Sequence, residues 1–202
     1  MTNEVNAFYE KYPYPSDTVK SIEDLDRHFW VMNVLKGIET KNKTAADIGC
    51  GTGEITYYLS TQFKSIKGFD FTNASLKNAN ALKNFLNLKN ICFEMSDITL
   101  AENRGKYDII FSTGVLHHIP DVKVAFENIK KMMHDDSYFV VSIYNKSSRM
   151  LWKRTPEKAD NSNKNRIMDE FYHPYEILYT KNGFKRFLEN NGFKVVKIWR
   201  DI

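Results

Sequence analysis

The stretch Asp47-Ile48-Gly49-Cys50-Gly51-Thr52-Gly53-Glu54 carries three glycines at alternate positions between two acidic residues. Residues 44–48 predict a short buried strand, and the residues after Gly53, to about Gln62, predict a helix. A strand that leads into closely spaced glycines and then a helix brings backbone amides against a ligand, because glycine has no Cβ in the way. The stretch therefore predicts a ligand-binding loop.

The charges of this loop distinguish between ligands. A dinucleotide-binding loop has the pattern G-x-G-x-x-G, and Glu54 stands at the position of its third glycine. A carboxylate there would repel a pyrophosphate, whereas Asp47 and Glu54 together suit a cationic ligand without a phosphate. The loop therefore argues against a nicotinamide dehydrogenase and favours a positively charged ligand.

Downstream of the loop, apolar strands alternate with helical patterns. The predicted elements are strands at 66–70, 91–95, 107–112, 137–144 and 193–199, with helices from Asn73 or Ser75 to about Leu86, at 122–133 and at 180–191. This alternation predicts right-handed βαβ units and an α/β fold, a doubly wound, mostly parallel sheet with helices on both faces. Residues 145–178 interrupt the rhythm and predict a surface excursion, whose polar run at 153–166 suggests mobility.

The segment before the first strand has two parts. Pro13 and Pro15 end an aromatic cluster and are expected to bar a continuous helix and to favour extended backbone. From Ser21 to Gly37, apolar residues at spacings of three and four predict a helix. We therefore expect residues 1–40 to form a lid segment and a helix.

The amino-acid composition and net charge exclude several classes of function. The chain has 202 residues, 42% hydrophobic and 27% charged, which is typical of one globular domain, here at 41–202. Its formal net charge of +4 is lower than that of most nucleic-acid binders. Cys50 and Cys92 are too few for a disulfide framework or a metal knuckle, and no metal site is expected. We see no signal peptide and no apolar run of about 18 residues, and we expect a cytoplasmic protein without membrane contact.

Four motifs in chain order resemble those of the class I S-adenosylmethionine-dependent methyltransferases. They are Asp47 to Gly53, Asp70 at the end of the second strand, Asp97 after the third strand, and Tyr107 to Asp121 around the fourth. The resemblance covers residues 44–144. It implies the Rossmann-like fold of that family, with S-adenosylmethionine (SAM) as cofactor and S-adenosylhomocysteine as product.

The resemblance also assigns residues to the cofactor. Asp70 would accept hydrogen bonds from the ribose hydroxyls, and Asp97 would contact the adenine amino group. Phe71 and Ile98 would wall the adenine. The other implied cofactor-binding residues are Asp47, Gly49, Gly51, Gly53 and Ser112. Taken singly, Gly51 could be only a turn glycine, and Asp70 or Asp97 only a helix cap.

His117 and His118 are the candidate catalytic residues, because the loop after the fourth strand borders the methyl donor in this family. Either could act as a general base, and His117 is slightly favoured over His118. The alternative is that both only line the pocket or pack under it. The nearby sequence Ser112-Thr113-Gly114-Val115 differs from the [DN]-P-P-[YF] pattern of nucleic-acid amino-methyltransferases. We therefore expect methylation of a small molecule at oxygen, nitrogen or carbon. The alternatives are an RNA or protein acceptor, or a SAM-binding module without catalysis.

Aromatic residues at two places predict the acceptor contacts. Tyr9 and Tyr14 predict a lid that excludes water and shapes the acceptor pocket, with an aromatic strap packed on the sheet as the alternative. After the fifth strand, Tyr144, Arg149 and His173 are candidate acceptor contacts, and an arginine beside aromatic rings suits a carboxylate or phosphate.

The C-terminal part departs from the family pattern. The family's sheet closes with a sixth and a seventh strand, and this sequence predicts only the strand at 193–199. An incomplete strand pair would leave backbone groups unpaired. Three explanations are open: the final strand is absent, a downstream domain of a longer polypeptide supplies it, or a partner such as a second copy in a homodimer completes the sheet.

Overall fold

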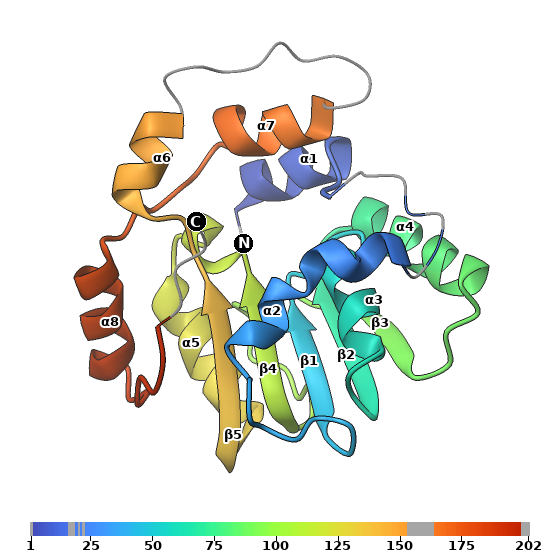
Figure 1. Ribbon diagram of the computed structural model, residues 1–202. Helices are drawn as coiled ribbons and strands as arrows, with labels where there is room; N and C mark the ends of the chain where they lie inside the picture. The colour runs from blue at the N-terminus through green and yellow to red at the C-terminus, as the bar shows by residue number, and fades with distance from the viewer. Residues whose placement is uncertain (1, 16–18, 20, 22, 153–163, 199–202) are drawn as a thin grey trace.

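The computed structural model describes residues 2–15, 19, 21, 23–152 and 164–198 (Figure 1). These residues form one sheet with helices on both faces, as predicted. No helix in the described ranges has the length and apolar character that a membrane crossing requires.

The sheet has five parallel strands in the order β3-β2-β1-β4-β5. They are β1 (Thr44–Ile48), β2 (Ser65–Asp70), β3 (Ile91–Met95), β4 (Tyr107–Thr113) and β5 (Met133–Ser142). In β1, Ala45 pairs with Ile66 on one side and Ile109 on the other. The order reverses at β1, so the carboxyl ends of β1 and β4 form the crevice where ligands bind in such sheets.

Two hydrophobic cores lie on the two faces of the sheet, and successive residues of the central strands contribute to them alternately. Ala45 and Ile109 face one core, and Ala46 and Ile110 face the other, because side chains alternate across a strand. The first core is covered by α3 (Glu54–Ser60), and α4 (Asn73–Phe85) packs beside it against β3. The second core is covered by α5 (Val122–Lys131) and α8 (Lys181–Asn190).

The extended backbone predicted for the N-terminal aromatic cluster is wrong over its first part. Helix α1 (Asn3–Lys11) occupies it, with the side chain of Thr2 as its N-cap. Pro13 and Pro15 lie beyond the last turn of α1, where proline limits a helix without preventing it.

The continuous helix predicted from Ser21 to Gly37 is also wrong. The chain forms a 3-10 helix, η1 (Glu23–His28), and a short helix, α2 (Trp30–Asn33). Phe29 follows Leu25 by four residues, a spacing that fits the apolar stripe of the predicted helix, yet Phe29 is 60% exposed. The tighter 3-10 turns change which residues face the sheet. The side chains buried there are Leu25, Val31 and Leu35.

β5 is the edge strand of the described sheet, and it starts four residues earlier than predicted. The strand predicted at 193–199 is not formed over 193–198, and residue 199 lies outside the described residues. The segment instead crosses the β5 edge. Phe193 packs on Phe139 with ring centroids 5.4 Å apart, and Lys197 donates to the backbone oxygen of Asn33 on the opposite face. That a second copy or a further domain pairs with this edge stays a prediction.

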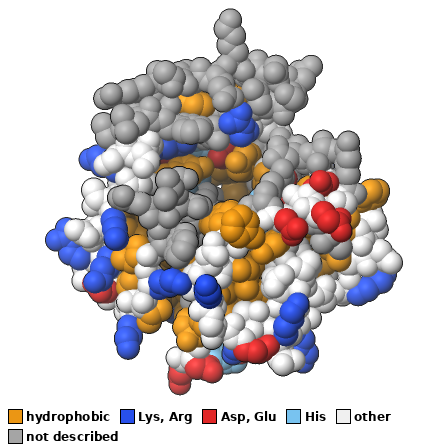
Figure 2. Space-filling model, in the orientation of Figure 1, with side chains coloured by type: hydrophobic (Ala, Val, Ile, Leu, Met, Phe, Trp, Pro, Cys, Tyr) orange, Lys and Arg blue, Asp and Glu red, His pale blue; other side chains and the backbone are white. Residues whose placement is uncertain are grey.

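The predicted excursion at 145–178 contains two helices, α6 (Lys146–Trp152) and α7 (Lys164–Tyr172). Residues 153–163, most of its polar run, lie outside the described residues. In Figure 1, α6, α7 and α1 lie together beyond one end of the strands. Figure 2 shows hydrophobic side chains over the middle of the face below them.

Candidate functional site

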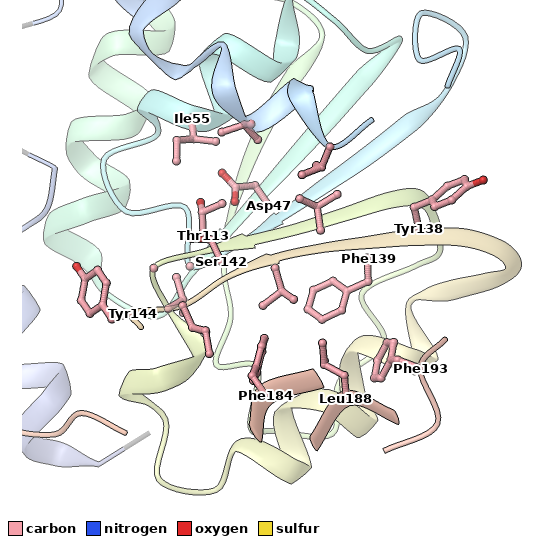
Figure 3. Close-up of a pocket in the computed structure, with 18 of the residues that line it drawn as sticks. Asp47, Ile55, Thr113, Tyr138, Phe139, Ser142, Tyr144, Phe184, Leu188 and Phe193 are labelled. Carbon is pink, nitrogen blue, oxygen red and sulfur yellow. The ribbon is translucent and has the colours of Figure 1, made fainter. Parts of the chain in front are cut away.

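A large cavity lies at the carboxyl ends of the central strands. Its volume is about 2180 Å³, and it continues along β5, where Phe184, Leu188 and Phe193 line it on the far side of that strand (Figure 3). The predicted site residues that line it are Tyr9, Tyr14, Asp47, Gly49, Gly51, Asp70, Phe71, His118 and Tyr144. The structure therefore brings residues of both the predicted cofactor site and the predicted acceptor site to one space.

Asp47 lies near the end of β1 and is 1% exposed. Its Oδ2 accepts a 2.6 Å hydrogen bond from Oγ1 of Thr56, one turn into α3. Burial raises the pKa of this carboxyl to about 7, although the Thr56 hydrogen bond opposes the shift. The nearby charge of Asp70 adds to the increase. A buried carboxylate in such surroundings is stabilised by a positive charge beside it.

Asp70 ends β2 and holds the glycine loop in place. Its Oδ2 accepts from the backbone N–H of Gly51 at 2.9 Å, and its Oδ1 accepts from the N–H and the hydroxyl of Thr72 at 3.0 and 2.7 Å. Burial raises the pKa of Asp70 despite these hydrogen bonds. Asp47 and Asp70, here called the carboxylate end of the cavity, thus present two buried acids to the same space.

The glycines of the loop make room for the protein's own atoms as well as for a ligand. Gly49, Gly51 and Gly53 have φ of +73°, +54° and +92°, a region that disfavours other residues. A Cβ on Gly51 would collide with the backbone oxygen of Tyr14, and a Cβ on Gly49 would collide with Val115. Part of the space that these glycines leave open is therefore occupied by the N-terminal segment.

Hydrogen bonds tie the N-terminal segment over this loop. The backbone oxygen of Tyr14 accepts from the N–H of Thr52 at 3.3 Å, and the oxygen of Pro15 accepts from the Thr52 hydroxyl. On α1, the hydroxyl of Tyr9 donates to Asp169 of α7 at 2.7 Å. The segment lies where a lid would lie; its function as a lid stays a prediction.

Other predicted cofactor residues lie outside the cavity lining. Asp97 accepts from the N–H and hydroxyl of Thr99 at 2.8 and 2.7 Å. Ile98 packs in the core under α5, and the hydroxyl of Ser112 donates to the backbone oxygen of Ile48. Gly53 faces Tyr57 and Phe93. The adenine contacts predicted for Asp97 and Ile98 stay predictions.

Three histidines, here called the histidine end, lie at the other side of the cavity opening. Their rings pack against one another and against Tyr144 at tilted angles, with centroid distances of 4.3 Å from Tyr144 to His117, 4.1 Å from His117 to His118, and 3.6 Å from His118 to His173. His118 and Tyr144 line the cavity, whereas His117 and His173 lie behind its wall. The guanidinium of Arg149 stacks on the outer face of Tyr144 at 4.2 Å.

Burial keeps the rings of His117 and His173 neutral. It lowers the pKa of His117 well below its ordinary value and lowers the pKa of His173 to about 3. Among the described residues, neither nitrogen of His117 has a hydrogen-bond partner, and neither does Nε2 of His173. A buried polar atom without a partner costs about 1–3 kcal/mol, so these atoms mark a place where a ligand would be stabilising.

The protons of two of these rings can be assigned from their partners. Nδ1 of His118 lies 2.8 Å from the backbone oxygen of Tyr175, so it donates, and in the neutral ring Nε2 carries the lone pair. In His173 the backbone N–H of Tyr175 donates to Nδ1 at 3.1 Å, so Nε2 carries the proton. His118 therefore has the position that a base needs, while His117 is buried behind it; a base role for either stays a prediction.

The sequence did not single out three residues of this site. Thr56 holds Asp47, Asp169 holds Tyr9, and Glu176 pairs with Arg149 at 2.8 Å. Thr56 could have been found, because it lies one turn into the helix that follows the glycine loop. Asp169 and Glu176 flank the aromatic stretch 171–175, but nothing in their spacing shows that they meet the residues after β4.

Comparisons with known proteins agree with this geometry. A family model described as a methyltransferase domain matches residues 39–192. Malonyl-[acyl-carrier protein] O-methyltransferase of Bacillus anthracis is 26% identical over 157 residues, which cover 75% of this chain and 54% of that protein. Trans-aconitate 2-methyltransferase of Deinococcus radiodurans is 38% identical over 77 residues, 37% of this chain and 28% of that protein. The chain therefore covers less than two thirds of either relative.

Two solved structures show the same fold. Magnesium protoporphyrin IX methyltransferase from Synechocystis PCC 6803, with bound S-adenosylhomocysteine, has a TM-score of 0.63 at 17% identity, covering 95% of this chain and 85% of that one. The DhpI complex with S-adenosylhomocysteine has a TM-score of 0.66 at 13% identity, covering 94% and 85%. Since the family model spans most of the sequence, the prediction from the four motifs is confirmed: the chain belongs to the methyltransferase-domain family and has the Rossmann-like fold of the class I methyltransferases.

Proposed function

We propose that the protein transfers a methyl group from SAM to a small-molecule acceptor. When bound, SAM supplies an electrophilic methyl group on a positively charged sulfur. The observation that carries the proposal is the carboxylate end, where Asp47 and Asp70 are 1% and 6% exposed and line the same cavity. Burial raises the pKa of both acids, so a cationic ligand that restores their ionised form would be stabilised there.

The residues present fit this cofactor. Asp47 would attract its cationic groups, and Asp70 would accept hydrogen bonds from its ribose hydroxyls. The loop from Gly49 to Gly53 would let its backbone approach the ligand closely. Phe71 also lines the cavity next to Asp70, and its ring packs edge-on to Tyr9 with centroids 6.2 Å apart. An apolar ring in this position would suit one face of a flat nucleoside base.

The acceptor would bind between the lid segment and the histidine end. Tyr9, Tyr14, His118 and Tyr144 line this part of the cavity. Methyl transfer by in-line displacement needs alignment of the acceptor and exclusion of water, which aromatic walls and a closed N-terminal segment provide. The names of the two relatives, acting on malonyl-[acyl-carrier protein] and on trans-aconitate, support an acceptor that carries an acid group.

The proposal is tested by incubating the purified chain with isotopically labelled SAM and fractions of a metabolite extract. Label in a small organic product, with S-adenosylhomocysteine formed in equal amount, is the expected result. Label found only in RNA or protein would contradict a small-molecule acceptor. SAM binding without any turnover would favour the non-catalytic module.

A further inference from the structure

Two consecutive imidazoles and one carboxylate converge behind the acceptor side of the cavity. His117, His118 and Glu176 each offer one ligand atom, and these atoms all lie within 4.8 Å of one another. We propose that these three side chains bind a divalent transition-metal ion such as Zn²⁺.

Backbone hydrogen bonds bring the carboxylate to the two rings. The backbone oxygen of Tyr175 accepts from Nδ1 of His118 at 2.8 Å, and the N–H of Ile177 donates to the backbone oxygen of His117 at 2.8 Å. These bonds lie on either side of Glu176 in the chain. They fix Glu176 beside the short 3-10 turn η2 (Leu116–His118) that carries both histidines.

Each histidine offers a ring nitrogen to a metal ion. His118 donates through Nδ1, so in its neutral form Nε2 carries the lone pair, and a backbone carbonyl on the other ring nitrogen is a usual support for a metal-bound histidine. His117 is 0% exposed, and neither of its nitrogens has a partner among the described residues. An ion would supply the missing partner of His117.

The ligand atoms lie near the spacing of a zinc site. Imidazole nitrogens and carboxylate oxygens bind Zn²⁺ at about 2.1 Å, so two ligand atoms of a tetrahedral site lie about 3.4 Å apart. The ligand atoms here lie within 4.8 Å of one another, so a closure of at most about 1.4 Å would bring them to that spacing. Two imidazoles with a carboxylate form a ligand set that suits divalent transition metals rather than Mg²⁺ or Ca²⁺.

The surrounding charges also permit a cation. Nε of Arg149 donates to Glu176 at 2.8 Å, which orients the carboxylate and neutralises the charge of the arginine. Asp169 is 2% exposed and offers an oxygen within 4.8 Å of a nitrogen of His118. Within the described part of this cluster, two carboxylates therefore accompany one guanidinium.

A second set of side chains shares His118. An oxygen of Asp169 and a nitrogen of His173 also lie within 4.8 Å of it and of each other. This set is less suitable because Nδ1 of His173 accepts a hydrogen bond from Tyr175, which places a proton on Nε2.

The test uses the full chain, stripped with a chelator and titrated with Zn²⁺ in a calorimeter, with Co²⁺ absorption in the visible range as a second readout. One ion per chain is expected. His117→Gln and Glu176→Gln should each weaken binding by about 100-fold or more, since even the loss of an outer partner of a metal ligand weakens affinity by about 10–100-fold. His134→Gln, at an exposed histidine, is the matched control and should bind like the wild type.

Each other outcome overturns the proposal. Absence of one-to-one binding by the folded wild type would show that the cluster is only a packed polar core. Unchanged affinity in His117→Gln and Glu176→Gln would place the ion elsewhere. Loss of binding in Asp169→Asn and His173→Gln, with binding kept in Glu176→Gln, would assign the ion to the second set. Circular dichroism shows whether each variant is folded, and the amide oxygen of Glu176→Gln can still accept from Nε of Arg149, so that the fold is retained. Because SAM is not added, failure here would leave the proposed methyl transfer untouched.

Discussion

The carboxylate end and the histidine end both bury polar groups, but they stabilise them differently. Asp47 and Asp70 accept hydrogen bonds from Thr56, Gly51 and Thr72, all of which lie within a few dozen residues along the chain. His117 has no such partner among the described residues and sits against a segment some sixty residues further on, through the bond from Ile177.

Because of this difference, the two ends place different directional requirements on a ligand. A carboxylate with satisfied hydrogen bonds still favours an added positive charge, and it needs no particular direction of approach. An imidazole nitrogen without a partner needs a ligand along its lone pair or its N–H bond. The carboxylate end therefore suits a large cationic ligand, and the histidine end suits a directed contact with an ion.

The largest expected effect is at the contact between the loop and the N-terminal segment. Gly51→Ala should lower the free energy of unfolding by about 2–5 kcal/mol, because the positive φ of +54° disfavours alanine and its Cβ would collide with the backbone oxygen of Tyr14. Urea denaturation measures the change.

Gly37 gives a matched control for this variant. It also has a positive φ, +92°, but a Cβ there would meet nothing within 4 Å. Gly37→Ala should cost only the backbone strain, about 1–2 kcal/mol. Equal losses in the two variants would mean that Tyr14 does not press on the loop.

The second-largest expected effect is a loss of SAM affinity that is confined to the carboxylate end. Asp70→Ala should weaken SAM binding by about 10–100-fold, since a hydrogen bond to a charged group contributes about 1.5–3 kcal/mol. It should leave the histidine end unaffected. Calorimetry with Asp108→Ala as control, a partly exposed acid at the start of β4, isolates the site. Unchanged SAM affinity in Asp70→Ala would show that the second motif is misassigned.

A pH titration sharpens the comparison at the carboxylate end. The pKa of Asp47 is raised to about 7, so its ionised fraction, and with it the affinity for a cation, should rise about tenfold from pH 6 to pH 8. The stability of the ligand-free protein depends on pH in the opposite direction. A folded-state pKa above the unfolded value of about 3.9 means that stability falls as pH rises from about 4 to about 7. Both slopes should flatten in Asp47→Asn, and parallel profiles of the two proteins would exclude Asp47 as their source.

The smallest expected effect concerns the link between α1 and α7. Tyr9→Phe removes the donor to Asp169 at 2.7 Å and should cost about 1 kcal/mol in unfolding free energy. SAM affinity should change by a few-fold at most, because the loop contacts of Tyr14 remain. Thermal unfolding and calorimetry on the same samples compare the two quantities, and a loss of SAM binding as large as that of Asp70→Ala would contradict this ranking.

Local sequence predicted the carboxylate end and most of the sheet. β1, the glycine loop and α3 are continuous in the chain, so strand pattern, glycine spacing and charge identify them together. The same holds for β2 with Asp70. The helix predicted from Ser21 failed because 3-10 turns follow a different spacing, so Phe29 points outward although it fits an α-helical stripe.

The histidine end could be predicted only in part. His117 and His118 follow β4 and were identified by their position, but Glu176 and Asp169 reach them through the long connection after β5. The strand predicted at 193–199 also shows this limit. Its apolar residues pack against one face of β5, and the chain then crosses the edge of this strand toward Asn33. Tertiary contacts determine this path, and the local sequence pattern does not encode them.

Calorimetric titration of the full chain with SAM, and in parallel with NADH and ATP, tests the assignment of the carboxylate end most directly. We predict one-to-one binding of SAM, no comparable binding of the two phosphate-bearing ligands, and loss of SAM binding when Asp47 and Asp70 are both changed to asparagine. Tight binding of NADH or ATP by a chain that ignores SAM would contradict the account.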